Sequence, residues 1–242
     1  MTIIKNLNYV IFFIFVTAFS GFAQNNAETS LHLLGDFAED WEKDWIERKL
    51  PVKPTKYEVA EEDSNKVLMA TSIQGSSALW RMVSVKPEKF GKISWRWKIQ
   101  SNYSDKKKEK TKMGDDYVAR LYVIFEPHLV SWKTRSLCYV WAAKEPVGSM
   151  YKSPYASTSG IIVLQSGKEN KKKWMQEERD FVADYHKVFG KNPQMVTGVA
   201  IMVDSDNTNQ EAMTWFDDIV LKAGSAKKRG TRKRPIIKLF DK

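Results

Sequence analysis

Short segments in which apolar and polar side chains alternate recur along this chain, and they constrain its fold more than any other feature. In the clearest one, 92–99, two isoleucines and two tryptophans share one face and polar side chains share the other. The expected strands are 32–37, 57–62, 67–72, 78–85, 93–99, 117–125, 137–142, 161–165, 173–181, 196–203 and 213–221. Only 181–189 has helical spacing, and Gly190 ends it in the expected way. The pattern predicts an all-β sandwich or barrel with one short helix near residues 181–189.

The first residues have the features of an export signal. Lys5 precedes a nearly apolar run at 9–19, and Gly-Phe-Ala at 21–23 supplies the small residues that a signal peptidase needs. The run is shorter than the roughly 20 apolar residues that span a bilayer. We therefore expect a signal peptide at 1–23 and a periplasmic or secreted protein; an uncleaved anchor is the alternative.

The net charge of +10 is concentrated at the carboxyl end of the chain. Residues 226–242 contain eight Lys or Arg against Asp241 alone, a net charge of +7, so the remainder is close to neutral. We expect one domain at 24–225 and a disordered basic tail, and the alternative for the tail is contact with an anionic envelope surface. The body lacks the basic stripe with interleaved aromatics that binds nucleic acid, so we expect no such partner.

The segment 113–125 predicts a polar ligand site on one face of a strand. After Gly114, alternation places Asp116, Arg120 and Tyr122 on one face with Val118 and Ile124, and it places Tyr117, Ala119, Leu121, Val123 and Phe125 on the other. An acid, a guanidinium and a phenol on one face suit a polar ligand.

The segment 135–142 offers a second set of candidate ligand-binding residues. Arg135, Tyr139 and Trp141 alternate with small side chains, so the large set could extend the polar face of 113–125 or fill the space between two sheets. Sequence leaves these two placements open. The single cysteine, Cys138, lies in this run and is expected to be a small buried hydrophobe.

Catalytic and metal motifs are weak in this chain. It contains no Gly-x-Ser-x-Gly, and its three histidines are far apart without metal-ligand spacing. The segment 204–208, Asp-Ser-Asp-Asn-Thr, is rich in oxygen ligands but lacks the Gly and Glu of a calcium-binding EF-hand loop. A turn that satisfies its own backbone is favoured there over a different calcium site.

Several blocks together resemble a bacterial exported family called domain of unknown function 3047. They are Trp95-Arg96-Trp97, the segment 112–120, Tyr139-Val140-Trp141-Ala142, Asp184-Tyr185 with Phe189-Gly190, and the segment 204–208. The resemblance spans most of 36–221 and implies one domain in the cell envelope without an assigned catalytic residue.

The two ends of the domain resemble carbohydrate-binding modules of jelly-roll type. The resemblance rests on Gly35-Asp36-Phe37 and on the segment 215–221. It implies an antiparallel β-sandwich of jelly-roll type, and a structural calcium held by Asp36 with Asp217 or Asp218. We expect no other cofactor.

These observations lead to three hypotheses of function. The first is a non-catalytic exported sandwich that binds a polar ligand of the saccharide class through one sheet face. The second is an envelope glycan hydrolase or lyase that uses the acids of that face. The third is a structural envelope protein that binds another protein.

The export hypothesis predicts the amino terminus of the mature protein. Cleavage after Ala23 leaves Gln24 as the first residue, which mass spectrometry of the protein from its native host would detect. An intact Met1 would contradict the prediction.

Overall fold

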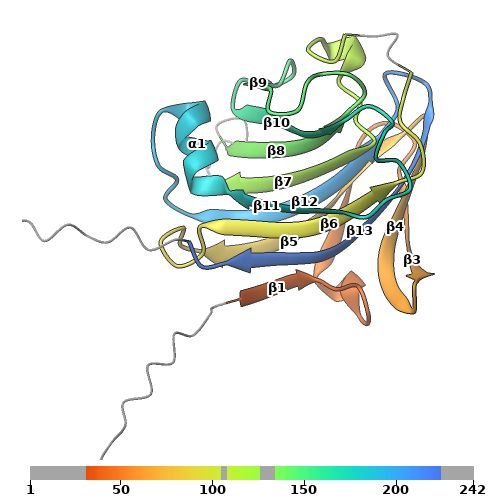
Figure 1. Ribbon diagram of the computed structural model, residues 1–242. Helices are drawn as coiled ribbons and strands as arrows, with labels where there is room; N and C mark the ends of the chain where they lie inside the picture. The colour runs from red at the N-terminus through yellow and green to blue at the C-terminus, as the bar shows by residue number, and fades with distance from the viewer. Residues whose placement is uncertain (1–30, 105–107, 126–133, 225–242) are drawn as a thin grey trace, which may run out of the picture.

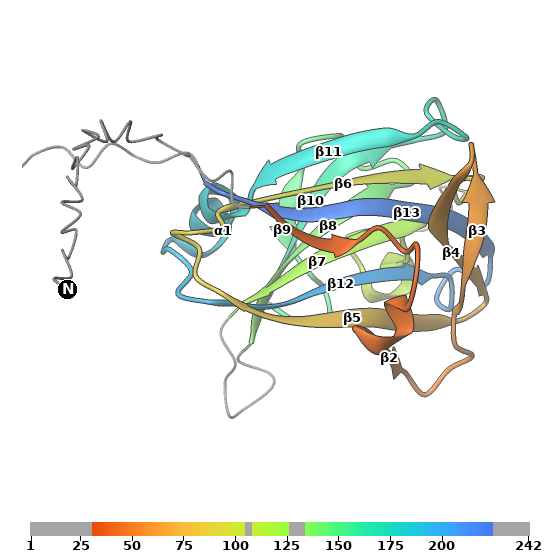
Figure 2. The ribbon, with the colours of Figure 1, turned by 90° about the horizontal axis from the view of Figure 1, so that it is seen from below.

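Two β-sheets pack face to face in this computed structural model, which describes residues 31–104, 108–125 and 134–224 (Figure 1). The first sheet has the order β11 (Met175–Asp180), β6 (Lys92–Ile99), β13 (Glu211–Lys222), β4 (Asn65–Ile73) and β3 (Lys56–Glu62), with β1 (Leu31–Gly35) also paired to β13. The second has the order β2 (Trp45–Lys49), β5 (Ser76–Val85), β12 (Val196–Asp204), β7 (Ala119–Phe125), β8 (Arg135–Ala142), β10 (Ser159–Ser166) and β9 (Met150–Lys152). Figure 2 shows the two layers from below. The predicted all-β sandwich of jelly-roll type is confirmed, although β8 and β10 are parallel.

Each expected strand corresponds to a strand of the structure, within a few residues at its ends. Two short strands, β2 and β9, were not predicted. The strand expected at 117–125 begins only at Ala119, so the predicted alternation is wrong for the residues before it. Tyr117 packs with the outer cluster around Cys138 and Val140 instead of the core between the sheets.

The helix α1 (Phe181–Phe189) has the predicted bounds and lies at one end of the sandwich (Figure 2). The side chain of Asp180 accepts a hydrogen bond of 2.8 Å from the Ala183 amide and caps the first turn. Gly190, at φ 72°, ends the helix in the left-handed conformation that glycine adopts without strain. Phe181 and Tyr185 are buried against Phe125, so the helix closes this end of the core.

Aromatic side chains fill the space between the sheets. Trp95 and Trp97 of β6 are fully buried, which confirms their expected core placement. The ring centroids of Trp95 and Tyr139 lie 5.4 Å apart, and those of Trp97 and Trp141 lie 6.0 Å apart, so these pairs join the two sheets. Such aromatic contacts add to the large apolar area that each ring removes from water.

Neither Tyr139 nor Trp141 lies on the open face that we considered for them. In the β7–β8 register, Tyr139 faces Leu121 and Trp141 faces Ala119, which both point into the sandwich. The Tyr139 hydroxyl donates to Asp184 Oδ2 at 3.1 Å, and Trp141 Nε1 donates to the Gly167 carbonyl at 3.2 Å. The large side chains of β8 are therefore core, and its small ones face outward.

Within residues 31–104, 108–125 and 134–224, the structure has no helix with the length and apolar character of a membrane span. The predicted signal peptide at 1–23 and the basic tail at 226–242 lie outside these residues.

The placement of Trp141 predicts a large effect on stability. Trp141→Ala should lower the free energy of unfolding by about 3–5 kcal/mol, because it removes a fully buried ring and leaves a cavity. Met82→Ala is the control, since Met82 is 72% exposed, and it should change stability by roughly 0.5 kcal/mol or less. Urea denaturation measures both. Similar effects of the two substitutions would contradict the placement.

Candidate ligand site

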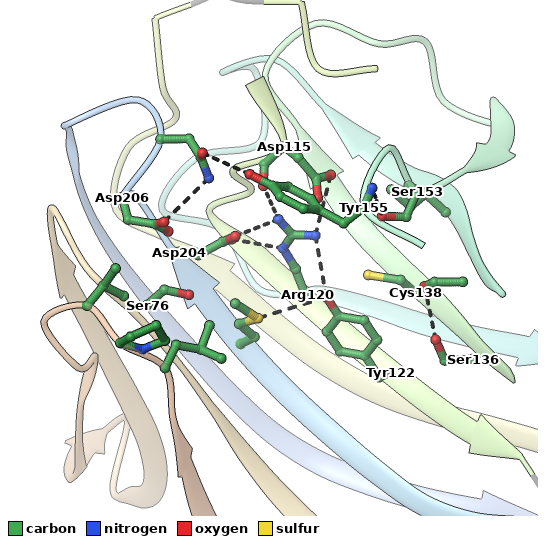
Figure 3. Close-up of a pocket in the computed structure, with 17 residues that line it drawn as sticks. Ser76, Asp115, Arg120, Tyr122, Ser136, Cys138, Ser153, Tyr155, Asp204 and Asp206 are labelled. Carbon is green, nitrogen blue, oxygen red and sulfur yellow. Dashed lines mark hydrogen bonds and ion pairs between the residues drawn. The ribbon is translucent and has the colours of Figure 1, made fainter. Parts of the chain in front are cut away.

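A cavity of about 490 Å³ opens on the outer face of the seven-stranded sheet (Figure 3). Its floor comes from neighbouring strands, with Arg120 and Tyr122 of β7, Cys138 of β8 and Asp204 of β12. Tyr155 and the segment 50–52 line its sides. The cavity therefore combines residues from parts of the chain that are distant in sequence.

The alternation of β7 and its neighbours explains the space above the floor. The register partners of Tyr122 are Cys138 on β8 and Ala200 on β12, and both have small side chains. Ser136 and Ser159, which also line the cavity, are register partners whose hydroxyls lie 2.9 Å apart. Small outward side chains on three strands thus leave the sheet surface open around Arg120 and Tyr122.

Arg120 and Asp204 form a buried ion pair at the centre of the site. Arg120 Nε donates to Asp204 Oδ1 at 2.8 Å and Arg120 Nη2 donates to Asp204 Oδ2 at 2.5 Å. Each side chain is only 4% exposed. The guanidinium also donates to the Asp115 carbonyl, and the Tyr117 amide donates to Asp204 Oδ1 at 3.0 Å. A two-point pair of this kind fixes both partners in orientation as well as in position.

Three acids of the site, Asp115, Asp204 and Asp206, lie in surroundings that disfavour the ionised form of their carboxyl groups. Burial raises the pKa of the Asp204 carboxyl to about 7, although the guanidinium of Arg120 acts in the opposite direction. Burial also raises the pKa of Asp115, and burial together with the carboxylate of Asp116 raises that of Asp206. The pair with Arg120 is therefore what allows Asp204 to ionise near neutral pH.

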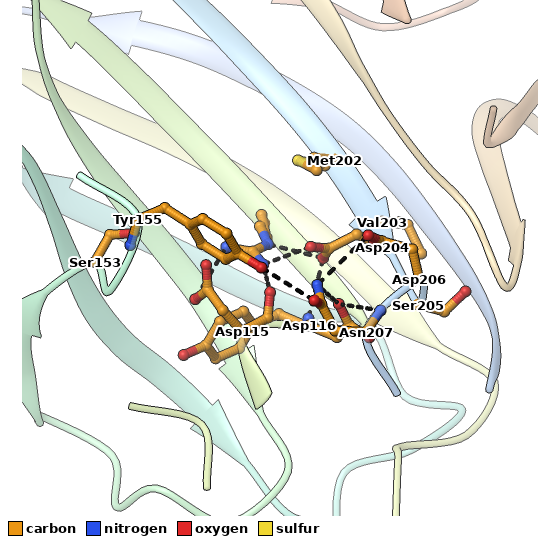
Figure 4. A network of polar contacts seen from close by, with 12 residues as sticks. Asp115, Asp116, Ser153, Tyr155, Met202, Val203, Asp204, Ser205, Asp206 and Asn207 are labelled. Atoms are coloured by element: carbon orange, nitrogen blue, oxygen red, sulfur yellow. Dashed lines mark hydrogen bonds and ion pairs between the residues drawn. The ribbon is translucent and has the colours of Figure 1, made fainter. Parts of the chain in front are cut away.

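Asp116 does not lie on the polar face where the alternation placed it, because it precedes the first residue of β7. It is 2% exposed and does not line the cavity. Its Oδ1 accepts from the Asn207 side chain at 3.0 Å, and its Oδ2 accepts from the Thr208 amide at 2.6 Å. Asp116 thus closes the turn after β12 (Figure 4), and the partner of Arg120 is Asp204.

Arg120 and Tyr122 lie on one face, as expected, and both line the cavity. The guanidinium of Arg135 lies 5.6 Å from the ring of Phe189, at the end of the sandwich near α1, and Arg135 is not among the lining residues. Of the six predicted ligand residues, the structure therefore brings two into the cavity. Their role in binding a ligand stays a prediction.

The three acids predicted to hold a structural calcium have different surroundings. Asp217 is buried, and its Oδ2 accepts from Arg96 Nη2 at 2.5 Å and from Asn65 at 2.7 Å. Asp218 lies 3.0 Å from Arg96 Nε, and the exposed Asp36 accepts from the Ala38 amide at 3.3 Å. Arg96 thus supplies positive charge to two of the three, and a calcium ion at this position stays a prediction.

Cys138 is buried, which agrees with its expected role as a small hydrophobe. Burial raises the pKa of its thiol to about 12, so the thiolate needed for nucleophilic attack is scarce at neutral pH.

Sequence reasoning missed Ser76 and Tyr155 as lining residues. Tyr155 is 55% exposed, and its hydroxyl lies 3.0 Å from Asn207 Oδ1, which connects the wall of the cavity to the turn after β12. Ser76 is the register partner of Asp204. Neither residue belongs to a local motif, so only strand pairing and loop packing could reveal them.

A family model described as "Protein of unknown function (DUF3047)" matches residues 40–220, which confirms the expected resemblance. No protein with a curated description matches the sequence.

Solved structures with a similar chain path include carbohydrate-binding modules. The family 11 module of the Clostridium thermocellum cellulase Lic26A-Cel5E is 11% identical, with a TM-score of 0.45 over 81% of this chain and 96% of that one. The CBM22-1 xylan-binding domain of Paenibacillus barcinonensis Xyn10C is 13% identical, with a TM-score of 0.41 over 83% of this chain and 100% of that one. These likenesses are distant, and the fold and the site rest on the residues described above.

The buried pair predicts strong coupling between Arg120 and Asp204. Arg120→Met should destabilise the protein by about 3–5 kcal/mol, because it leaves the Asp204 carboxylate buried without a counter-ion. Adding Asp204→Asn should recover part of that loss. A double-mutant cycle by urea denaturation measures the coupling. Additive effects of the two substitutions would contradict the pair.

Proposed function

Because this chain belongs to the DUF3047 family, which carries no assigned activity, we propose its function from the site itself: binding of an uncharged polar ligand, of the saccharide class, in the cavity on the seven-stranded sheet. The observation that carries the proposal is a cavity whose polar groups converge beside apolar walls. Its volume of about 490 Å³ lies within the range of small-molecule sites.

The lining groups match the chemistry of a sugar. The hydroxyls of Ser153 and Tyr122 can both donate and accept, as the hydroxyls of a saccharide require. Leu50 and Val52 are 47% and 39% exposed, so they offer apolar surface to the C–H faces of a ring. Tyr155 adds an aromatic surface with a polar tip.

The charge of the cavity favours a neutral ligand over an anionic one. Among the described residues that line it, Arg120 is the basic side chain, while Asp115, Asp204 and Asp206 are acids. The guanidinium is already paired with Asp204. A carboxylate or phosphate on the ligand would meet excess negative charge, whereas a polyol would not.

The same contacts support binding without turnover. A general base needs a lone pair, and a general acid a proton, that can reach the substrate. Asp116 does not line the cavity, and both oxygens of Asp204 are turned toward Arg120, so neither acid is positioned to exchange a proton with a ligand there. Product release from a glycan would instead favour the hydrolase hypothesis.

Export to the periplasm or beyond is part of the proposal, because a glycan-binding role suits the signal-like features of 1–23. Contact of the basic tail with an anionic surface is a separate proposal, in which eight basic residues would add roughly 1 kcal/mol each near anionic lipid.

The proposal predicts the effect of a substitution in the cavity wall. Tyr155→Ala should weaken glycan binding at least tenfold, about 1.4 kcal/mol, because it removes aromatic surface from the wall. Isothermal titration against a panel of neutral oligosaccharides and cell-wall fragments measures this.

The matched control is Trp174→Ala. Trp174 stacks with Arg96 and Lys98 of β6, in the other sheet. Binding that Trp174→Ala abolishes and Tyr155→Ala leaves intact would place the ligand on the six-stranded sheet. No binding of any glycan by the parent protein would contradict the saccharide class.

A further inference from the structure

We propose that Asp116, Asp204 and Asp206, together with the hydroxyl of Ser76, form a calcium site at the edge of the cavity. The inference concerns the cation alone and does not depend on the saccharide proposal.

The three acids are close enough to share one ion. Among the described residues, one oxygen from each carboxylate can be chosen so that all three lie within 4.8 Å of one another. Calcium binds oxygen at about 2.3–2.6 Å, so two ligands on opposite sides of the ion lie about 4.6–5.2 Å apart. The spacing therefore fits a calcium shell. Figure 4 shows the carboxylates gathered at the turn that follows β12.

Each acid keeps lone pairs beyond its present hydrogen bonds. Asp204 Oδ2 accepts from Arg120 Nη2, and Asp116 Oδ2 accepts from the Thr208 amide, which leaves a second lone pair on each oxygen. Asp206 is half-buried, and its contact with the Asn207 side chain is long, at 3.5 Å from Oδ2 to Nδ2. Asp206 is therefore the acid with the most freedom to turn toward an ion.

Ser76 gives the independent evidence for a ligand at this position. Its side chain is 1% exposed, yet its Oγ has no hydrogen-bond partner among the described residues. A buried hydroxyl without a partner costs free energy, so the hydroxyl of Ser76 favours a ligand from outside the chain at this position. Ser76 is directly opposite Asp204 in the β5–β12 register, which brings their Cβ atoms to about 4.5–5.5 Å. In Figure 3 its oxygen points into the cavity beside Asp204 and Asp206.

Charge balance also favours a cation. Three carboxylates converge here and one guanidinium, that of Arg120, is within hydrogen-bond distance of one of them. Two of the acids are almost completely buried, where unbalanced charge is most costly. A divalent ion would neutralise the two excess negative charges.

The chemistry of the ligands selects calcium among the common ions. Carboxylate and hydroxyl oxygens are hard ligands, which suit calcium or magnesium better than the transition metals that prefer imidazole or thiolate. Magnesium requires a tight octahedron at about 2.0–2.1 Å, which places opposite ligands only about 4.2 Å apart. Carboxylates that other contacts already orient, as those of Asp204 and Asp116 are, suit the flexible shell of calcium better than an exact octahedron. The site is distinct from the one predicted at Asp36, Asp217 and Asp218.

Terbium luminescence tests the inference on the purified full-length protein. Tb³⁺ takes calcium sites and emits when a nearby tyrosine is excited, and the hydroxyl of Tyr155 lies 3.0 Å from Asn207 in the same turn. We expect emission from the parent protein that Ca²⁺ displaces and Mg²⁺ displaces far less. Isothermal titration with Ca²⁺ then gives the affinity.

Two variants assign the ligands. Asp206→Asn should weaken Ca²⁺ binding at least tenfold, and Ser76→Ala should weaken it several-fold with an unchanged far-ultraviolet circular dichroism spectrum. The matched controls are Asp218→Asn and Ser84→Ala, the latter on the same strand as Ser76; both should bind Ca²⁺ as the parent does.

Three results would overturn the inference. The first is a parent protein that neither binds Ca²⁺ nor sensitises Tb³⁺. The second is unchanged affinity in both Asp206→Asn and Ser76→Ala. The third is loss of binding in Asp218→Asn with retention in Asp206→Asn, which would place the ion at the other group of acids.

Discussion

The ion pair between Arg120 and Asp204 is the interaction on which the site depends. It joins the start of β7 to the end of β12, and the same guanidinium holds the Asp115 carbonyl. Taking two charges out of water is costly unless their remaining lone pairs and protons are hydrogen-bonded. Here the Tyr117 amide donates a further hydrogen bond to Asp204 Oδ1. The pair thus contributes geometry more than net stability: it fixes the turn after β12 and the floor of the cavity in one arrangement.

The cavity exists because bulk is distributed unequally over the two faces of one sheet. On β8 the large residues Tyr139 and Trp141 point inward and meet the tryptophans of β6, while Cys138 and Ser136 point outward. Aromatic rings therefore fill the core, and the outer face of the same strand carries only small side chains, which leaves space for the cavity. An exchange of the two sets would bury small side chains and cover Arg120, so packing and site follow from one alternation.

The local sequence pattern was sufficient to predict most of the fold, but it predicted only part of the site. Alternation located the strands, and Asp180 with Gly190 bounded the helix, because these signals act over a few residues. Alternation also separates the two faces of β8, but it does not tell which face is inward; the register with β7 decides that. The partner of Arg120 lies 84 residues away, and no pattern near Arg120 points to it. Tyr155 and Ser76 were missed for the same reason.

The turn after β12 connects the two proposals through charge. Without a cation, the acids beside Arg120 leave the cavity negative, which disfavours anionic ligands and leaves neutral polyols unaffected. A bound calcium ion would lower that negative charge, and calcium takes hydroxyl oxygens, the groups a saccharide presents, among its ligands. A cation and a neutral sugar are therefore compatible occupants of one cavity. An acidic sugar would need the cation first, so the charge state of this turn would decide which class of glycan the sheet can hold.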